Sequence, residues 1–181
     1  MYRLRCHVFH DRLGWDVRVE NGREHDWFDL IGPHYLVAHN GDETAIGCCR
    51  LLPTQGPNML RDIFPFLLDG SEPPAAESVW EVSRFAVSDC KPCDGFGFSE
   101  IPSLMVAQAV RFAADHGVEA LVGVTSAPFE RMLQGMGLQI ERLGAARRIG
   151  RVMSLAFRLP LDAATLKVAN DTVRNELRHA A

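Results

Sequence analysis

Long apolar runs are missing from this sequence. None approaches the roughly 18 residues that a membrane-spanning helix requires. The first residues, Met1 to Arg5, also lack the apolar segment of a secretory signal peptide. We therefore expect a cytoplasmic protein with no membrane partner.

An excess of positive charge is missing as well. The chain has 19 Lys and Arg against 23 Asp and Glu, which gives a net charge of -4. Proteins that bind nucleic acid along its backbone need a clustered positive surface. We therefore expect no nucleic-acid partner.

Cysteine and histidine are present without a clear metal-binding pattern. The five cysteines are an odd number, which without a signal peptide indicates reduced thiols. Cys90 and Cys93 have C-x-x-C spacing, but neither a second such pair nor a histidine pair at zinc-finger spacing accompanies them. The seven histidines are scattered and form no H-E-x-x-H. We expect no metal site.

Several catalytic motifs are absent too. The sequence has no P-loop, no G-x-G-x-x-G and no nucleophile elbow, which disfavours phosphoryl transfer and Rossmann dinucleotide chemistry. What remains is ordinary for a soluble globular protein: 181 residues, 47% hydrophobic and 23% charged. One domain over residues 1–181 is the simplest organisation.

Apolar periodicity predicts one mixed sheet flanked by helices. The turn at Asn40-Gly41-Asp42 predicts a hairpin, and Ser99 with Pro102 predicts the start of a helix. Strands are predicted at 35–39, 44–52, 79–87, 120–125, 138–143 and 151–159. Helices are predicted at 2–13, 99–116, 127–136 and 162–179, short helical turns at 59–68, and loops at 23–35, 69–77 and 90–98.

The strand at 79–87 is unusual because Glu81 and Arg84 lie inside an apolar run. Buried carboxylates and guanidinium groups need partners. In a regular strand these two side chains would point to opposite faces, so either a bulge brings them together or each has its own partner. The pair is either a structural ion pair at a sheet edge or a carboxylate held in a cleft as a base.

Charged residues with apolar neighbours occur in three places. They are Arg5 with Phe9 and Trp15; Glu24, Asp26 and Asp29 with Trp27; and Arg50 with Glu81 and Arg84. Each group alone is explained by solvation or a structural salt bridge. Gathered by one sheet, they would suit a zwitterionic or cationic ligand, with acids for an ammonium or sulfonium and arginines for a carboxylate.

These residues, in this order, also carry a resemblance to a known family. The matching motifs are Leu4-Arg5-x-x-Val8-Phe9, Gly14-Trp15-Asp16-Val17, Glu24-x-Asp26-x-x-Asp29, Gly47-Cys48-x-Arg50-Leu51-Leu52-Pro53-Thr54 and Trp80-Glu81-x-Ser83-Arg84-Phe85. The chain resembles the acyl-homoserine-lactone synthases, the LuxI-type autoinducer synthases of bacterial quorum sensing. The resemblance implies an α/β (α+β) fold similar to the GNAT N-acetyltransferases: three α-β-α layers, a mixed, mostly antiparallel sheet and a V-shaped cleft.

The resemblance also implies a reaction. An acyl group passes from acyl carrier protein, or from coenzyme A, to the amine of S-adenosylmethionine, and lactone closure releases methylthioadenosine. Both molecules are substrates, so no cofactor is implied. The alternative is a GNAT-like N-acyltransferase acting on another amine, although the R/Q-x-x-G-x-G/A loop typical of acetyltransferases is absent. A binding module without catalysis is a third interpretation.

Matched positions imply roles for particular residues. Glu81 would accept the proton of the substrate amine, and Arg84 would order the site and favour the oxyanion. The implied S-adenosylmethionine cleft comprises Arg5, Phe9, Trp15, Asp26, Asp29 and Arg50. The acyl-pocket candidates, several of which must simply be core residues, are Leu104, Met105, Leu121, Thr125, Met132, Leu133, Met136 and Leu138.

Three further expectations follow from the resemblance. Thr125 is associated in the family with 3-oxo acyl groups, but the small Gly123 two residues before it leaves that choice open. A basic cluster would dock an acidic carrier protein or is an ordinary solvated face; it comprises Arg131, Arg147, Arg148 and Arg151. The first helix is expected to be shorter than is typical, because Met1 precedes Leu4 by three residues.

Overall fold

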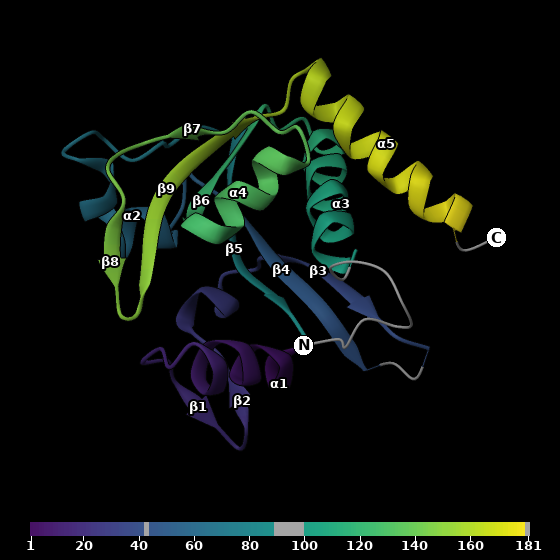
Figure 1. Ribbon diagram of the computed structural model, residues 1–181. Coiled ribbons are helices and arrows are strands. Elements are labelled where there is room, and N and C mark those ends of the chain that lie inside the picture. The colour runs from purple at the N-terminus through teal and green to yellow at the C-terminus, as the bar shows by residue number, and fades with distance from the viewer. Residues whose placement is uncertain (42–43, 89–99, 180–181) are drawn as a thin grey trace.

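A computed structural model describes residues 1–41, 44–88 and 100–179 (Figure 1). A seven-stranded sheet forms its centre, in the order β3-β4-β5-β6-β9-β7, with β8 paired to β9. Its strands are β3 (His34–His39), β4 (Ala45–Pro53), β5 (Val79–Val87), β6 (Ala120–Ser126), β7 (Glu141–Arg142), β8 (Arg147–Ile149) and β9 (Val152–Pro160). Only the pair β5–β6 is parallel among these described strands, so the sheet is mixed and mostly antiparallel, as expected.

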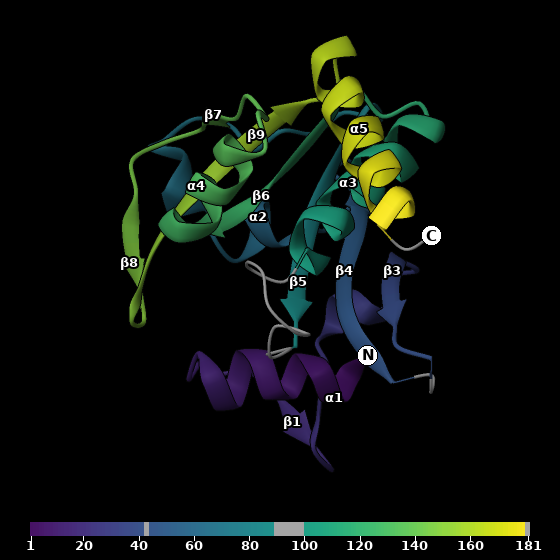
Figure 2. The ribbon, with the colours of Figure 1, turned by 45° about the vertical axis from the view of Figure 1, so that its right-hand side comes forward.

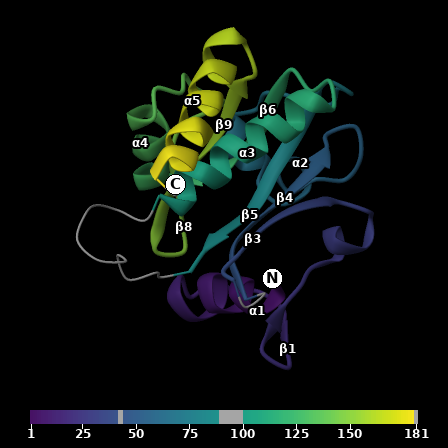
Figure 3. The ribbon, with the colours of Figure 1, turned by 90° about the vertical axis from the view of Figure 1, so that its right-hand side faces the viewer.

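The helices cover both faces of this sheet. They are α1 (Tyr2–Arg5), the π-helix η1 (Cys6–Arg12), the 3-10 helices η2 (Trp27–Leu30) and η3 (Pro65–Leu68), α2 (Met59–Asp62), α3 (Ile101–Asp115), α4 (Ala127–Gly135) and α5 (Ala163–His179). Figure 3 shows α3, α4 and α5 on one side and α1 on the other, beside a small ribbon of β1 (Val19–Glu20) and β2 (Arg23–Glu24). The expected three α-β-α layers are confirmed.

Neighbouring residues of β4 show how the two faces are built. Cys48 packs against Val8 and the rest of an N-terminal apolar cluster, whereas Cys49 packs against Met105 and Ala109 of α3. The alternation follows from the two-residue period of a strand. We call the side facing α1, η2 and α2 the N-terminal layer. Figure 2 shows α1 beneath the end of β5, with which it is in contact.

A bulge in β5 answers the question about Glu81 and Arg84. Cys48 pairs with Ala86 and Arg50 pairs with Ser83, so two steps along β4 match three along β5. The extra residue lies in β5. Arg84 has φ +52°, a left-handed conformation that is uncommon for arginine.

The bulge places Ser83 and Arg84 on the same face, toward the N-terminal layer. Arg50 donates to Ser83 Oγ at 3.1 Å, and Arg84 donates to Glu24 at 3.2 Å. Glu81 faces the same layer and accepts from the Leu60 amide. Both parts of the sequence-based alternative therefore hold: a bulge brings the two side chains to one face, and each has its own partners there.

The sheet divides beyond Val82. Strands β5 and β6 pair only from Val79–Ala120 to Val82–Gly123. Past this point β5 pairs with β4 alone and β6 with β9 alone. A Cβ on Gly123 would lie 2.5 Å from the Val82 carbonyl oxygen, so only glycine permits this last close pairing. The V-shaped cleft expected from the resemblance begins here.

Some predicted elements differ from the structure. The strand predicted at 138–143 is reduced to Glu141–Arg142, and β8 has no counterpart among the predicted strands. The segment predicted as a loop at 23–35 contains β2, η2 and the start of β3. The predicted loop at 90–98 lies outside the described residues. No helix among the residues described is both long and apolar enough to cross a membrane.

Candidate active site

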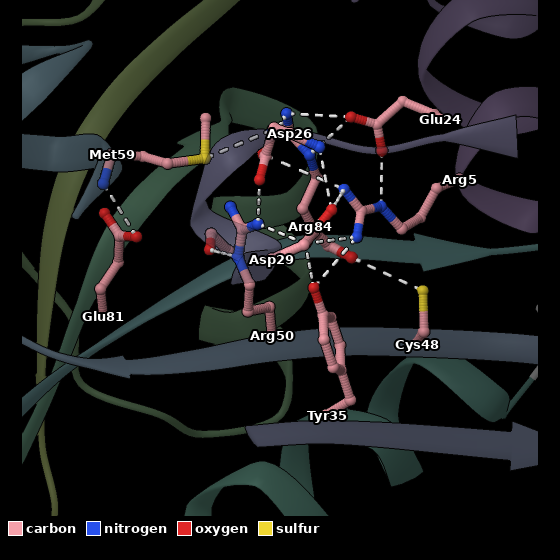
Figure 4. Close-up of polar contacts among 11 residues, drawn as sticks. Arg5, Glu24, Asp26, Asp29, Tyr35, Cys48, Arg50, Met59, Glu81 and Arg84 are labelled. Carbon is pink, nitrogen blue, oxygen red and sulfur yellow. Dashed lines mark hydrogen bonds and ion pairs between the residues drawn. The ribbon is translucent and has the colours of Figure 1, made fainter. Parts of the chain in front are cut away.

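Three arginines and three acids from distant parts of the chain meet in the N-terminal layer (Figure 4). Arg5 of α1 donates from Nε to Glu24 Oε2 at 2.5 Å. Its Nη1 and Nη2 donate to the two carboxylate oxygens of Asp29 at 2.9 and 3.1 Å. This two-bonded geometry is the strongest form of an arginine–carboxylate contact.

The other two arginines complete the network. Arg50 Nη1 donates to Asp26 Oδ1 at 2.6 Å and to Asp29 Oδ1 at 2.8 Å. Arg84 Nη2 lies 2.7 Å from Asp26 Oδ2 and 3.1 Å from Glu24 Oε1. Each of the three acids thus contacts two arginines, at distances of 2.5–3.1 Å. We call these six residues the ion-pair network.

Burial makes the balance of charge in this network important. The side chains of Arg5, Arg50 and Glu24 are fully buried, at 0% exposure. An isolated buried charge is strongly unfavourable, and only pairing with good geometry compensates for it. Three positive and three negative groups sum to zero, so the network tolerates burial as a whole but not the loss of one member.

The local fold presents two of these acids. Asp26 and Asp29 form a capping box around the start of η2, where the Asp29 carboxylate accepts from the Asp26 amide at 2.9 Å. Asp29 also accepts from the Tyr35 hydroxyl. Although burial acts to raise the pKa of Asp29, the bonds from Arg5 and Tyr35 outweigh it and bring the pKa to about 2.

Glu81 has a different environment from these acids. It is 1% exposed and accepts hydrogen bonds from the backbone amides of Leu60 at 2.6 Å and Met59 at 3.1 Å, at the start of α2. Burial raises the pKa of Glu81, although these amides and the charge of Arg50 oppose the shift. A carboxylate with a raised pKa is a stronger base than an ordinary glutamate.

Burial lowers the pKa of Arg84, and the charges of Arg50 and Arg5 act in the same direction, while Glu24 and Asp26 oppose it. Its guanidinium carbon lies 5.3 Å from the centre of the Phe9 ring. Trp15 stacks on that ring at 5.2 Å, and its indole Nε1 is buried without a hydrogen-bond partner.

A cavity of about 380 Å³ runs through the gap between β5 and β6. On the N-terminal layer it is lined by Phe9, Trp15, Met59, Phe64, Glu81, Ser83 and Arg84. On the opposite side it is lined by apolar residues that include Val106, Ala109, Val110, Leu133, Phe157 and Leu159. The cavity therefore joins an aromatic and charged half to an apolar half.

The predicted cleft residues fall into two groups. Phe9, Trp15, Glu81 and Arg84 line the cavity. Arg5, Asp26, Asp29 and Arg50 are not among the lining residues and lie behind the wall, in the ion-pair network. From there Arg50 and Asp26 contact the lining residues Ser83 and Arg84, respectively.

The predicted acyl pocket is placed only in part. Leu121, Thr125 and Leu133 line the cavity. Leu104, Met105, Met132, Met136 and Leu138 are not among the lining residues. The helix α3 presents Val106, Ala109 and Val110 instead, because Met105 faces β4, against Gly47 and Cys49.

The basic residues predicted to dock a carrier protein are all exposed. Arg147 and Arg148 lie on β8, Arg151 in the turn directly before β9, and Arg131 on α4. Arg147 is already paired with Asp69, at 2.7 Å. This pairing leaves Arg131, Arg148 and Arg151 as the more available positive charges.

Sequence reasoning grouped Glu24 with Asp26 and Asp29 but gave it no role in the site, and it gave none to Tyr35, Met59 or Ser83. Glu24 lies in the same acid-rich stretch as Asp26 and Asp29. This closeness in the sequence is the signal that could have assigned it to the ion-pair network. Ser83 lies between Glu81 and Arg84 in the strand. The backbone amide of Met59 bonds Glu81, and its sulfur accepts from Arg84 at 3.3 Å; neither contact has a sequence signal.

Comparisons with known proteins identify a family. The family model described as "Autoinducer synthase" matches residues 1–168. An acyl-homoserine-lactone synthase of Pseudomonas aeruginosa is 36% identical over 167 residues, which cover 91% of this chain and 83% of the relative.

Two solved structures are also similar. The crystal structure of the AHL synthase LasI has a TM-score of 0.84 at 35% identity and covers 93% of this chain and 85% of its own. The coenzyme-A-dependent acyl-homoserine lactone synthase BjaI, solved with SAM and isopentyl-CoA, has a TM-score of 0.82 at 26% identity, and the match covers 94% of this chain and 78% of BjaI.

Proposed function

Because the chain belongs to the autoinducer synthase family, we propose that it acylates the amine of S-adenosylmethionine from a thioester and then closes the lactone. The products are an N-acyl-homoserine lactone, a quorum-sensing signal, with methylthioadenosine and the free carrier thiol. The observation that carries this proposal is Glu81, a buried base on the wall of a cavity that joins two chemically different halves.

The charged and aromatic half of the cavity suits S-adenosylmethionine. Its sulfonium is a cation, which the stacked rings of Phe9 and Trp15 would attract. The unpartnered Trp15 Nε1 would donate to an acceptor of the substrate. Behind these rings the ion-pair network holds the wall in place, which favours a preorganised site.

Glu81 would act as the base of the first step. Only a neutral amine has a lone pair to attack the thioester carbonyl, so the ammonium must first give up a proton to Glu81, directly or through a water. The C–N bond forms, the C–S bond breaks, and the departing thiolate takes up a proton. Arg84 would lie near the developing oxyanion and stabilise it.

Lactone closure follows without a further protein nucleophile. The methionyl carboxylate oxygen attacks its own γ-carbon, and the bond from that carbon to the sulfonium breaks. Methylthioadenosine leaves as a neutral molecule, so the positive charge on sulfur makes it a good leaving group. The protein contributes mainly by folding the substrate into ring geometry.

The acyl chain would occupy the apolar half of the cavity. Val106, Val110 and Leu133 would contact it, and Thr125 offers a hydroxyl to an oxygen on the chain. The predicted residues that do not line the cavity would act through packing.

Acyl carrier protein is acidic and would dock on Arg131, Arg148 and Arg151; acyl-coenzyme A, the donor class named for BjaI, is the other candidate.

The enzyme would work as one domain over residues 1–181, without a cofactor, in the cytoplasm where both of its substrates are made.

A direct test incubates the purified protein with S-adenosylmethionine and either acyl carrier protein or coenzyme A thioesters. Mass spectrometry should detect an acyl-homoserine lactone and an equal amount of methylthioadenosine. An acylated amine without methylthioadenosine would instead identify an N-acyltransferase acting on another substrate.

A further inference from the structure

The N-terminal helix carries metal-binding side chains that the proposed reaction does not use. Cys6, His10 and Asp11 lie on η1, and one sulfur, nitrogen or oxygen ligand atom from each lies within 4.8 Å of the others. His7 lies close by, with its Nδ1 3.7 Å from Asp11 Oδ2. In the part of the chain that the structure describes, no other group of three such side chains is this close.

The π-helix explains why these side chains meet. In an α-helix a residue faces those three and four positions further on, whereas hydrogen bonds in a π-helix join residues five apart. Such a bond runs from the Leu13 amide to the Val8 carbonyl at 3.1 Å. The wider turn lets Cys6 face His10 and Asp11 together, four and five residues on.

The donor set matches a particular class of ion. Thiolate, imidazole and carboxylate are the ligands that zinc takes, at about 2.3, 2.0–2.1 and 2.0–2.2 Å. We propose that Cys6, His10 and Asp11 bind a divalent ion of the zinc class, with His7 or a water as the fourth ligand. Binding would contract the group by side-chain rotation. The Cys6 thiol would release its proton to solvent as the sulfur–metal bond forms.

The position of this site suggests what the ion would do. Phe9 belongs to the same π-helix and lines the cavity, and Arg5 precedes Cys6 in the chain. An ion that ties residue 6 to residues 10 and 11 would stabilise η1, which holds Phe9 and continues directly from Arg5 at the end of α1. This inference rests on the geometry of η1 and does not depend on the proposed reaction.

Cobalt(II) provides a direct test because a thiolate–cobalt bond absorbs in the near ultraviolet. The experiment uses the full chain with Cys90→Ser and Cys93→Ser, which removes the C-x-x-C pair as a competing site. We expect one equivalent of cobalt to produce the charge-transfer band and zinc to displace it. Zinc should also raise the melting temperature, because an ion bound only to the folded state stabilises it.

Variants then assign the ligands. Cys6→Ser should abolish the band, and His10→Ala or Asp11→Asn should weaken binding by more than about 10-fold, the effect of losing even an outer-sphere partner. His10 and Asp11 are each 54% exposed, so these two variants should fold even if Cys6→Ser does not. His25→Ala, on a separate segment, is the matched control and should bind cobalt as the parent does. The proposal fails if cobalt gives no band, or if the band survives Cys6→Ser unchanged.

Discussion

The two halves of the cavity solve the problem of burial in opposite ways. The N-terminal half buries charge, and its wall depends on six residues that neutralise one another through bonds of 2.5–3.2 Å. The opposite half buries mainly apolar surface, contributed by α3, α4, β6 and β9. A charged network requires every partner, whereas apolar packing tolerates changes in shape at modest cost. Substitutions in the charged half should therefore cause large losses of stability or rate. Substitutions in the apolar half should mainly change which acyl chain is preferred.

Arg50→Met should give the largest loss of stability. It leaves Asp26 without its bond from Arg50 and removes one of three positive charges, so two arginines face three acids in a largely buried network. Breaking a buried ion pair from one side costs about 3–5 kcal/mol of the free energy of unfolding. Urea denaturation measures this. Lys167→Met, which removes an exposed ion pair with Asp171, is the control and should be indistinguishable from the wild type.

Glu81→Gln should give the next largest effect, on rate rather than on fold. Loss of the base should lower kcat/KM by at least about 10²-fold, while S-adenosylmethionine still binds in calorimetry. The wild-type kcat/KM should rise with pH through the raised pKa of Glu81, because the base works only when deprotonated. The variant should lose that rise. A variant with the wild-type pH profile would remove Glu81 from its proposed role.

Acid should destabilise the charged half selectively. The pKa of Asp29 falls from 3.8 to about 2 on folding, so its contribution is complete above about pH 4 and lost as the pH approaches 2. The loss amounts to about 2 kcal/mol. Denaturation at several pH values measures it. Thr125→Val, in the other half of the cavity, should keep the wild-type dependence on pH; a flattened profile in that variant would contradict the division between the two halves.

Val110→Ala should give the smallest change. It enlarges the apolar half and should cost about 1–3 kcal/mol of stability. The ratio of kcat/KM for a longer acyl chain to kcat/KM for the chain that the wild type prefers should rise roughly 10-fold. This is the effect of about one methylene group in an apolar pocket. Competition between thioesters of different length, read by mass spectrometry, measures the shift. Val118→Ala, which shortens a buried core valine that does not line the cavity, is the matched control and should leave the preference unchanged.

The charged half of the site is largely predictable from the sequence, and the apolar half is not. The resemblance to the family assigns most residues of the ion-pair network to one site, because charged residues beside apolar ones are conspicuous in a sequence and can be matched motif by motif. Glu24 stands out only as a neighbour of Asp26. The conflict between Glu81 and Arg84 in one strand leaves two alternatives, of which a bulge is one.

Apolar residues carry no such signal. Leu104 and Met105 are as apolar as Val106 and Val110, and which face of α3 meets the cavity is decided by how the helix docks on the sheet. The same holds for Leu138, which packs into the main core. The π-helix at Cys6–Arg12 is also hidden in the sequence, because its apolar spacing fits an α-helix equally well.

The close approach of Gly123 to the Val82 carbonyl affects where the sheet opens. Strands β5 and β6 remain paired up to Gly123, which has no side chain. The cavity that we propose for both substrates opens immediately beyond this residue. Any larger residue there would force the strands apart earlier and lengthen the opening toward the core. The absence of a Cβ at residue 123 thus determines where the opening between β5 and β6 begins.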